Sequence, residues 1–153
     1  MKKLFFIFFI FLNFSFAWSL FSNKTPTEYA KSYCQKLQAK LPMKLDEITT
    51  YTNCYNKKNV IYNIAYIDTS DKSFKKLFHK QSFLNDLKSI KEKEIYTKIC
   101  PKSNWIMESI LINKHNVEFV NIFKEKETNQ TLLTVIINKN ICHEFLKYQK
   151  QKK

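Results

Sequence analysis

The chain has 153 residues, a length that suits one domain of ordinary size, and its formal net charge is +13. It contains no glycine, and all 26 of its basic residues are lysine. The absence of glycine excludes the phosphate-binding P-loop, the dinucleotide-binding turn and the glycine-flanked nucleophile elbow. The absence of arginine excludes guanidinium forks that would bind phosphates or carboxylates.

The first 17 residues have the three parts of a secretory signal peptide. Lys2 and Lys3 form the charged region, residues 4–12 are apolar throughout, and Ser15 and Ala17 are small residues at positions −3 and −1. We predict cleavage after Ala17, with Ser19 as a second option, and residues 18–24 as a linker. The protein would then be periplasmic or secreted, with no membrane span after cleavage. The alternative is an uncleaved signal that anchors the chain.

Cleavage would lower the formal charge from +13 to +11, because two lysines and no acids are lost. The lysines are spread along the whole chain, and only residues 147–153 form a dense basic tail. Because no nucleic-acid-binding motif is present, we expect no nucleic-acid partner. The charge favours attraction to an anionic surface, such as lipid headgroups, cell-wall polymers or acidic proteins. A solvated, lysine-rich surface is the alternative.

Four cysteines remain in the predicted mature chain, and an even number in an exported protein favours disulfides. Four cysteines allow three pairings. Cys100 precedes Pro101, where a helix is expected to end, and Cys142 follows the last expected strand. The Cys100–Cys142 pairing is therefore our first choice, and Cys34–Cys54 follows by elimination.

The first helix is predicted to begin at Thr25. Thr25 is a good N-cap, Pro26 suits the first helical position, and Glu28 completes a capping box. Apolar residues at three- and four-residue spacing continue this helix until Pro42 ends it. Residues 48–54 and 60–67 are rich in β-branched and aromatic residues, and they predict an antiparallel hairpin. In its turn, residues 56–59, asparagine is expected to take the left-handed positions.

A polar loop at residues 68–73 precedes one or two amphipathic helices that are predicted to end at Cys100. A short helix is expected over residues 103–110, with Trp105 and Ile106 turned inward. Residues 117–123 and 131–137 predict a second hairpin, and the tail after Phe145 is expected to be frayed or helical.

The element order α-β-β-α-α-β-β indicates an α+β fold. We predict an antiparallel sheet of four to five strands with helices packed on one face, in a single domain over residues 25–146 that is followed by the basic tail. The other face would be a binding surface or a plain solvent-facing sheet. The residues expected to share it are drawn from Thr49, Tyr51, Asn53, Tyr55, Asn63 and Glu118.

No arrangement typical of an enzyme emerges from the sequence. The three histidines, His79, His115 and His143, lack the spacing of a zinc motif. His143 follows Cys142 directly, whereas catalytic partners generally come from separate segments. We therefore predict a non-enzymatic protein without a metal or cofactor.

One short motif indicates a modification. Glu127, Asn129 and Thr131 match the extended Asp/Glu-x-Asn-x-Ser/Thr acceptor of bacterial N-glycosylation, in the expected tip of the second hairpin. The sequon at Asn23 lacks the upstream acid. Asn129 is therefore the predicted glycosylation site.

The layout from Lys31 to Cys142 resembles the small periplasmic secretin pilotins of the β type, and a broader set of small uncharacterised periplasmic proteins is similar to it in cysteine layout. The shared pattern is a first helix that runs into Leu41-Pro42, the hairpin at residues 48–67, a helical stretch ending at Cys100-Pro101 and a last hairpin closing on Cys142. The resemblance implies a sheet with helices on one side, a disulfide between the equivalent cysteines, and binding to a segment of a secretin. Pilotins of this type are lipoproteins, whereas the first cysteine of this chain, Cys34, lies too far downstream for a lipobox.

These observations lead to one expected function and one rival. The favoured function is protein–protein contact with another envelope protein, as an accessory factor of a secretion or assembly machine. The rival is a soluble binder of a ligand or an anionic polymer through a basic face.

Overall fold

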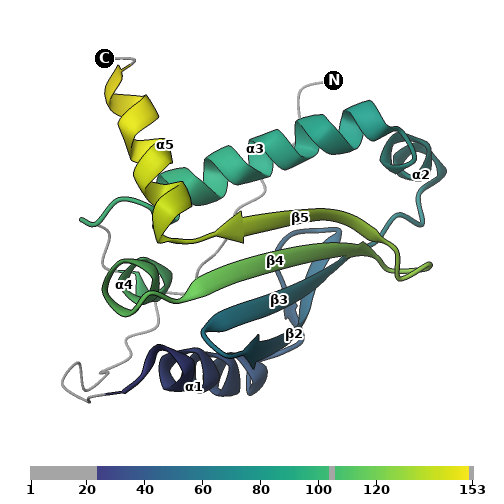
Figure 1. The fold of residues 1–153 in the computed structure, drawn as a ribbon. Helices are drawn as coiled ribbons and strands as arrows, with labels where there is room; N and C mark the ends of the chain where they lie inside the picture. Colours follow the sequence, from purple (N-terminus) through teal and green to yellow (C-terminus); the bar gives the residue numbers. More distant parts are fainter. Residues whose placement is uncertain (1–23, 104–105, 152–153) are drawn as a thin grey trace.

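The computed structural model describes residues 24–103 and 106–151 (Figure 1). The predicted signal peptide, most of the predicted linker and Trp105 lie outside these residues. The elements in chain order are α1 (Pro26–Gln38), β1 (Met43–Lys44), β2 (Thr49–Lys57), β3 (Val60–Ile67), α2 (Lys72–Phe78), α3 (Gln81–Ile99), α4 (Met107–His115), β4 (Glu118–Glu125), β5 (Thr131–Ile137) and α5 (Lys139–Gln151).

The first helix begins as its capping residues predict. The backbone N–H of Glu28 donates to Thr25 Oγ1 over 3.3 Å, and the backbone N–H of Thr25 donates to Glu28 Oε2 over 2.7 Å. These reciprocal bonds satisfy N–H groups that a helix start leaves without a partner. The helix ends at Gln38, before Pro42, and it buries Tyr29, Ala30 and Cys34.

The sheet has five strands in the order β1-β2-β3-β4-β5, and it is mixed. All neighbours are antiparallel except β3 and β4, which run parallel. The prediction of a purely antiparallel sheet is therefore wrong. A parallel pair needs a long crossover, and α2, α3 and α4 provide it between β3 and β4 (Figure 1).

The turns show how a chain without glycine reverses direction. Among the described residues, three non-glycine residues have positive φ: Lys58 at 54°, Asn116 at 52° and Asn129 at 59°. Asparagine tolerates this conformation better than most residues. The β2–β3 turn nevertheless places Lys58 there, so the expectation of asparagine was wrong for this turn. Asn116 ends α4, and Asn129 lies in the β4–β5 turn.

The helices pack on one face of the sheet. Ile61, Phe119 and Ile137 lie side by side on β3, β4 and β5, and all are almost fully buried. The core continues into α1 through Cys34, into α3 through Ile95 and Ile99, and into α4 through Leu111 and Ile112. The short helix expected at residues 103–110 is α4, which begins later, at Met107.

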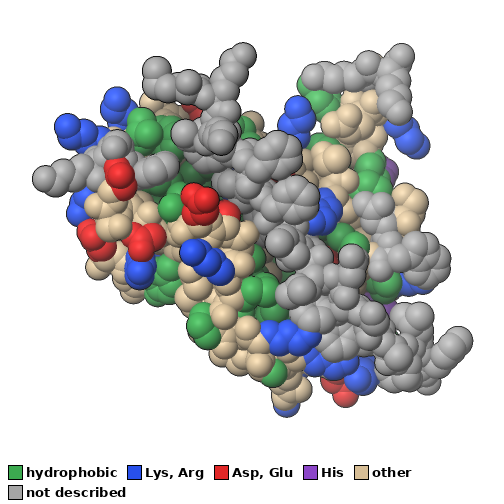
Figure 2. All heavy atoms as spheres, turned by 180° about the vertical axis from the view of Figure 1, so that it is seen from behind, with side chains coloured by type: hydrophobic (Ala, Val, Ile, Leu, Met, Phe, Trp, Pro, Cys, Tyr) green, Lys and Arg blue, Asp and Glu red, His purple; other side chains and the backbone are tan. Residues whose placement is uncertain are grey.

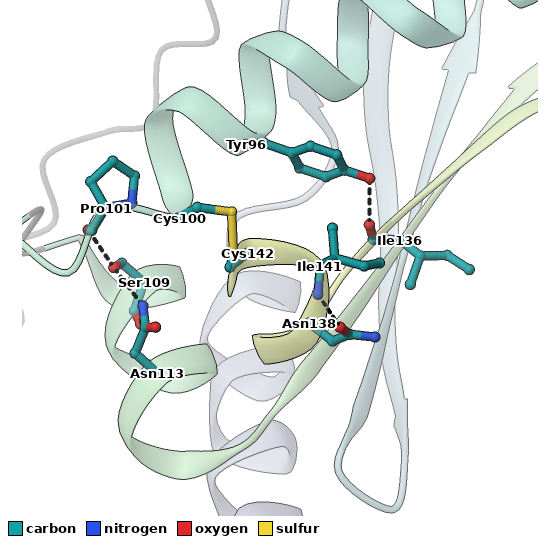
Figure 3. Close-up of a disulfide and its surroundings, with 9 residues drawn as sticks. All are labelled: Tyr96, Cys100, Pro101, Ser109, Asn113, Ile136, Asn138, Ile141 and Cys142. Carbon is teal, nitrogen blue, oxygen red and sulfur yellow. Dashed lines mark hydrogen bonds between the residues drawn. A yellow bond between two sulfur atoms is a disulfide. The ribbon is translucent and has the colours of Figure 1, made fainter. Parts of the chain in front are cut away.

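Two disulfides connect the helices to the rest of the fold. Cys34 of α1 bonds Cys54 of β2, with 5.2 Å between the Cα atoms, and Cys100 bonds Cys142 of α5, with 4.9 Å. Figure 3 shows the second disulfide between the end of α3 and the first turn of α5. Beside it, the Tyr96 hydroxyl donates to the backbone oxygen of Ile136 over 3.0 Å. These links hold α3 and α5 against the end of β5.

Candidate binding face

The sheet surface opposite the helices is the candidate binding face. Side chains alternate between the two faces of a strand, so the residues between the buried ones share this surface. Its first row crosses four strands and consists of Tyr55, Tyr62, Val120 and Ile136. Its second row consists of Asn53, Ile64, Ile122 and Thr134. None of these side chains belongs to the cluster of buried hydrophobic residues on the helix side of the sheet.

The first row is apolar, aromatic and accessible at both ends. The rings of Tyr55 and Tyr62 stack with centroids 5.0 Å apart and an interplanar angle of 7°. Tyr55 is 45% exposed and Ile136 is 41% exposed, whereas Val120 between them is buried. Contiguous apolar side chains at the surface are typical of interaction sites.

Polar residues border these two rows, whose apolar side chains meet at the centre of the face. At one end, Lys57, Val60 and Glu118 lie side by side, and Asn138 Nδ2 donates to Glu118 Oε2 over 2.8 Å. At the other end, a third row contains Tyr66 and Lys124. The binding face therefore has an apolar centre with a lysine on each border, Lys57 and Lys124.

Only some of the residues that were expected on this face lie on it in the structure. Asn53, Tyr55 and Glu118 do lie there, whereas Thr49 and Tyr51 are buried on the helix side. A β-bulge between Tyr51 and Asn53 is the reason, because one extra residue reverses the alternation along β2. The expectation that residues 49, 51, 53 and 55 all lie on the open face was therefore wrong for Thr49 and Tyr51.

Asn63 also lies on the helix side of the sheet, where it is 3% exposed. Its side-chain Nδ2 donates to Asn121 Oδ1 on the neighbouring strand over 3.0 Å. The expectation that Asn63 shares the open face was wrong. The bond across β3 and β4 pairs its Nδ2 group, whereas its buried Oδ1 atom has no hydrogen-bond partner among the described residues.

A second polar group lies inside the core between α1 and α4. The Tyr33 hydroxyl donates to Glu108 Oε1 over 2.7 Å, and Glu108 is only 8% exposed. Burial raises the pKa of Glu108, and burial together with the nearby Glu108 carboxyl raises the pKa values of Tyr33 and Tyr51. Sequence reasoning missed Glu108, although Leu111 and Ile112, three and four residues later, place it on the apolar side of its helix.

The histidines lie in separate surroundings. The ring of His115 stacks on the ring of Tyr29, with centroids 3.8 Å apart. His79 is exposed after α2. His143 Nδ1 lies 3.5 Å from Glu144 Oε1 at the surface of α5. Cys142 is in a disulfide. Within residues 24–103 and 106–151, no group of three or more His, Cys, Asp or Glu side chains is arranged to hold a metal ion.

The lysines are dispersed on the side of the molecule drawn in Figure 2. Where described side chains are visible in that view, the blue lysine side chains lie between acidic, apolar and other side chains. Asn129, the predicted glycosylation site, lies exposed in the β4–β5 turn.

Among the helices of the described part of the chain, none has the length and apolar character that crossing a membrane requires.

Comparison with known proteins finds solved structures of similar fold. No family model matches the sequence, and no curated protein matches it. Among solved structures, the pilotin EpsS of the Vibrio vulnificus type 2 secretion system aligns with a TM-score of 0.57 and 12% identity, over 76% of this chain and 91% of that one. A candidate secreted protein of Pseudomonas aeruginosa, PA3611, aligns with a TM-score of 0.52 and 12% identity, over 79% and 99%.

The Vibrio cholerae type II secretion pilotin AspS also aligns, with a TM-score of 0.46 and 11% identity, over 76% of this chain and 92% of that one. At these identities the likeness is one of fold. The structure is thus similar in fold to a type II secretion pilotin, in agreement with the resemblance found in the sequence.

Proposed function

We propose that this protein is an exported accessory factor of an envelope secretion or assembly machine, and that it acts by binding a segment of another envelope protein. The observation that supports this most directly is the binding face: an aromatic and aliphatic row, Tyr55 to Ile136, on the sheet surface opposite the described helices. The pilotin-like fold supports the same proposal.

The dimensions of the binding face favour a short amphipathic helix as the bound segment. Four neighbouring strands span about 14 Å, and the first two rows lie about 7 Å apart along the strands. A helix of three turns is about 16 Å long and about 10 Å wide, so one helix would cover both rows. Helices that bind in this way place apolar side chains at three- and four-residue spacing against the surface.

The charge of the protein favours acidic residues beside the apolar side of that helix. Lys57 and Lys124 lie on opposite borders of the binding face, and the chain as a whole has a formal charge of +13. Charged groups at the rim of an interface chiefly steer association and select the partner. We therefore propose an amphipathic helix with acidic flanking residues, supplied by an envelope protein.

Crosslinking in the periplasm followed by affinity purification tests this proposal. We compare the wild type with Ile136→Lys, which places a charge in the first row, and with Ile90→Lys on α3. Ile90 is the matched control because it is also an exposed isoleucine, at 55%, on a helix that packs on the other side of the sheet.

The wild type and Ile90→Lys are expected to recover a subunit of an envelope secretion or assembly complex, and Ile136→Lys is expected to recover at least tenfold less. Failure of the wild type to recover any envelope-complex subunit would overturn the proposal. Equal recovery by Ile136→Lys would show that binding does not use this face.

A further inference from the structure

The turn between β4 and β5 is tightly built and remains at the surface. The backbone N–H of Glu125 donates to the Gln130 oxygen over 2.8 Å, and the N–H of Asn129 donates to the Glu125 oxygen over 2.9 Å. The buried Glu125 carboxylate accepts hydrogen bonds from the hydroxyls of Thr69 and Thr128, and these bonds lower its pKa. The turn is therefore connected both within itself and to the loop after β3.

Every residue from 126 to 131 in this turn is exposed. Figure 1 shows the turn at the far end of the molecule from α5, projecting past the neighbouring strand. An enzyme that modifies the folded protein could therefore approach the turn without displacing a helix or a core residue.

The Asn129 side chain is held through its oxygen. The Tyr66 hydroxyl donates to Asn129 Oδ1 over 2.8 Å, and Lys124 Nζ donates to the same atom over 3.2 Å. N-glycosylation replaces one hydrogen on the amide nitrogen Nδ2 and leaves Oδ1 as a carbonyl oxygen. The modified side chain can therefore keep both hydrogen bonds, and the hairpin can keep its conformation.

The two other residues of the acceptor motif lie on either side of Asn129 in the same exposed turn. Glu127, two residues before it, pairs with Lys75 Nζ over 2.8 Å, and both side chains of this pair are nearly half exposed. Such exposed ion pairs contribute little to stability, so Glu127 can be released to another partner. Thr131, two residues after Asn129, begins β5 and is exposed.

We propose that Asn129 is a site of bacterial-type N-glycosylation. The donor would be a polyprenyl-diphosphate-linked oligosaccharide, used by a periplasmic oligosaccharyltransferase. Asn129 Nδ2 forms a bond to the anomeric carbon of the first sugar, while the bond from that carbon to the diphosphate oxygen breaks. Nδ2 loses one proton to a base of the transferase, and the polyprenyl diphosphate leaves with the bonding electron pair.

The position of the glycan relative to the binding face follows from the sheet register. Tyr66 and Lys124, which hold Asn129, form the third row, and Tyr66 lies four residues along β3 from Tyr62. Four strand residues span about 13 Å. The glycan would thus lie at the border of the binding face and leave the Tyr55–Tyr62 row accessible.

The test is co-expression of the full-length chain with a bacterial N-glycosylation system, with an established acceptor protein in the same cells. Intact mass and glycopeptide mass spectrometry are recorded for the wild type and three variants. Asn129→Gln removes the acceptor nitrogen, Glu127→Gln removes only the acidic charge, and Asn23→Gln removes the sequon that lacks the upstream acid. Circular dichroism shows whether each variant is folded.

The wild type and Asn23→Gln are expected to gain one glycan mass on the peptide containing Asn129. Asn129→Gln is expected to lose it completely, and Glu127→Gln is expected to fall at least tenfold. The proposal is overturned if the wild type is unmodified while the established acceptor is glycosylated, or if Glu127→Gln is modified as fully as the wild type. Because Glu127→Gln keeps Asn129, it decides the matter even where Asn129→Gln fails to fold.

Discussion

The hydroxyl of Tyr33 donates a 2.7 Å hydrogen bond to Glu108 Oε1, and so joins α1 to α4 across 75 residues of sequence. Glu108 is buried and Tyr33 is partly buried against the core, and the ring of Tyr33 packs edge-on against Phe119, with centroids 5.3 Å apart. The bond therefore connects the two helices to the centre of the sheet, on the side opposite the binding face.

Removal of this hydrogen bond should destabilise the protein. Tyr33→Phe leaves the buried Glu108 carboxyl without its hydroxyl donor, and such a loss costs about 1–3 kcal/mol of unfolding free energy. Urea denaturation followed by circular dichroism measures the change. The matched control is Tyr62→Phe on the binding face, which should change the unfolding free energy by less than about 0.5 kcal/mol. Equal effects of the two substitutions would contradict the buried contact.

Glu108 should make stability depend on pH. Burial raises its pKa, so the folded state keeps the proton to a higher pH than the unfolded state does. Its contribution to stability is therefore complete below the ordinary pKa and is lost as the pH rises through the raised pKa. Glu108→Gln stays neutral and retains Oε1 as an acceptor for Tyr33. Its stability relative to the wild type should increase as the pH rises above the ordinary carboxyl pKa of about 4, and it is measured from about pH 4 to pH 8.

Denaturation curves of both proteins across this pH range provide the measurement. A stability difference that does not change with pH would show that Glu108 has the same proton affinity in the folded and unfolded states.

The two disulfides should contribute unequally. Cys100 and Cys142 are 42 residues apart, and Cys34 and Cys54 are 20 residues apart. The entropy of loop closure predicts a loss of about 4 kcal/mol for the Cys100→Ala/Cys142→Ala pair and about 3 kcal/mol for Cys34→Ala/Cys54→Ala. Chemical denaturation of the two double variants measures this order. Free thiols in the non-reduced wild type, detected by alkylation and mass spectrometry, would contradict the pairing itself.

Two neighbouring isoleucines test the assignment of the sheet faces. Ile137 is fully buried against the helices, whereas Ile136 is 41% exposed on the binding face. Ile137→Ala should cost about 2–5 kcal/mol, because it leaves a cavity in the core. Ile136→Ala should cost less than about 1 kcal/mol, as expected of a surface position. Thermal and urea unfolding of the two variants measure the loss of unfolding free energy in each. A larger loss for Ile136→Ala than for Ile137→Ala would show that the two faces of β5 are assigned the wrong way round.

Several elements could be predicted because local chemistry determines them. The capping residues Thr25, Pro26 and Glu28 fix the start of α1, and the β-branched and aromatic stretches 60–67 and 131–137 coincide with β3 and β5. These features depend only on neighbouring residues, so a single sequence contains the information.

Long-range features could not be predicted in the same way. The parallel pairing of β3 with β4 depends on where three helices return the chain, and hairpin reasoning does not include that path. The bulge near Tyr51 reversed the alternation along β2, so Thr49 and Tyr51, which were expected on the binding face, proved to be buried on the helix side. The apolar row Tyr62, Val120 and Ile136 arises from strand register, which sequence spacing alone does not give.

The most direct test of the proposed binding face is site-specific photo-crosslinking in living cells. A benzophenone amino acid replaces Tyr55, which lies in the first row and is 45% exposed. In a matched control it replaces Tyr148, a tyrosine on α5 that is 54% exposed. We predict that the Tyr55 position crosslinks to an amphipathic, acid-flanked segment of an envelope secretion or assembly protein, and that the Tyr148 position does not. Equal crosslinking from both positions, or a Tyr55 crosslink only to residues 18–23 of the same chain, would contradict the account.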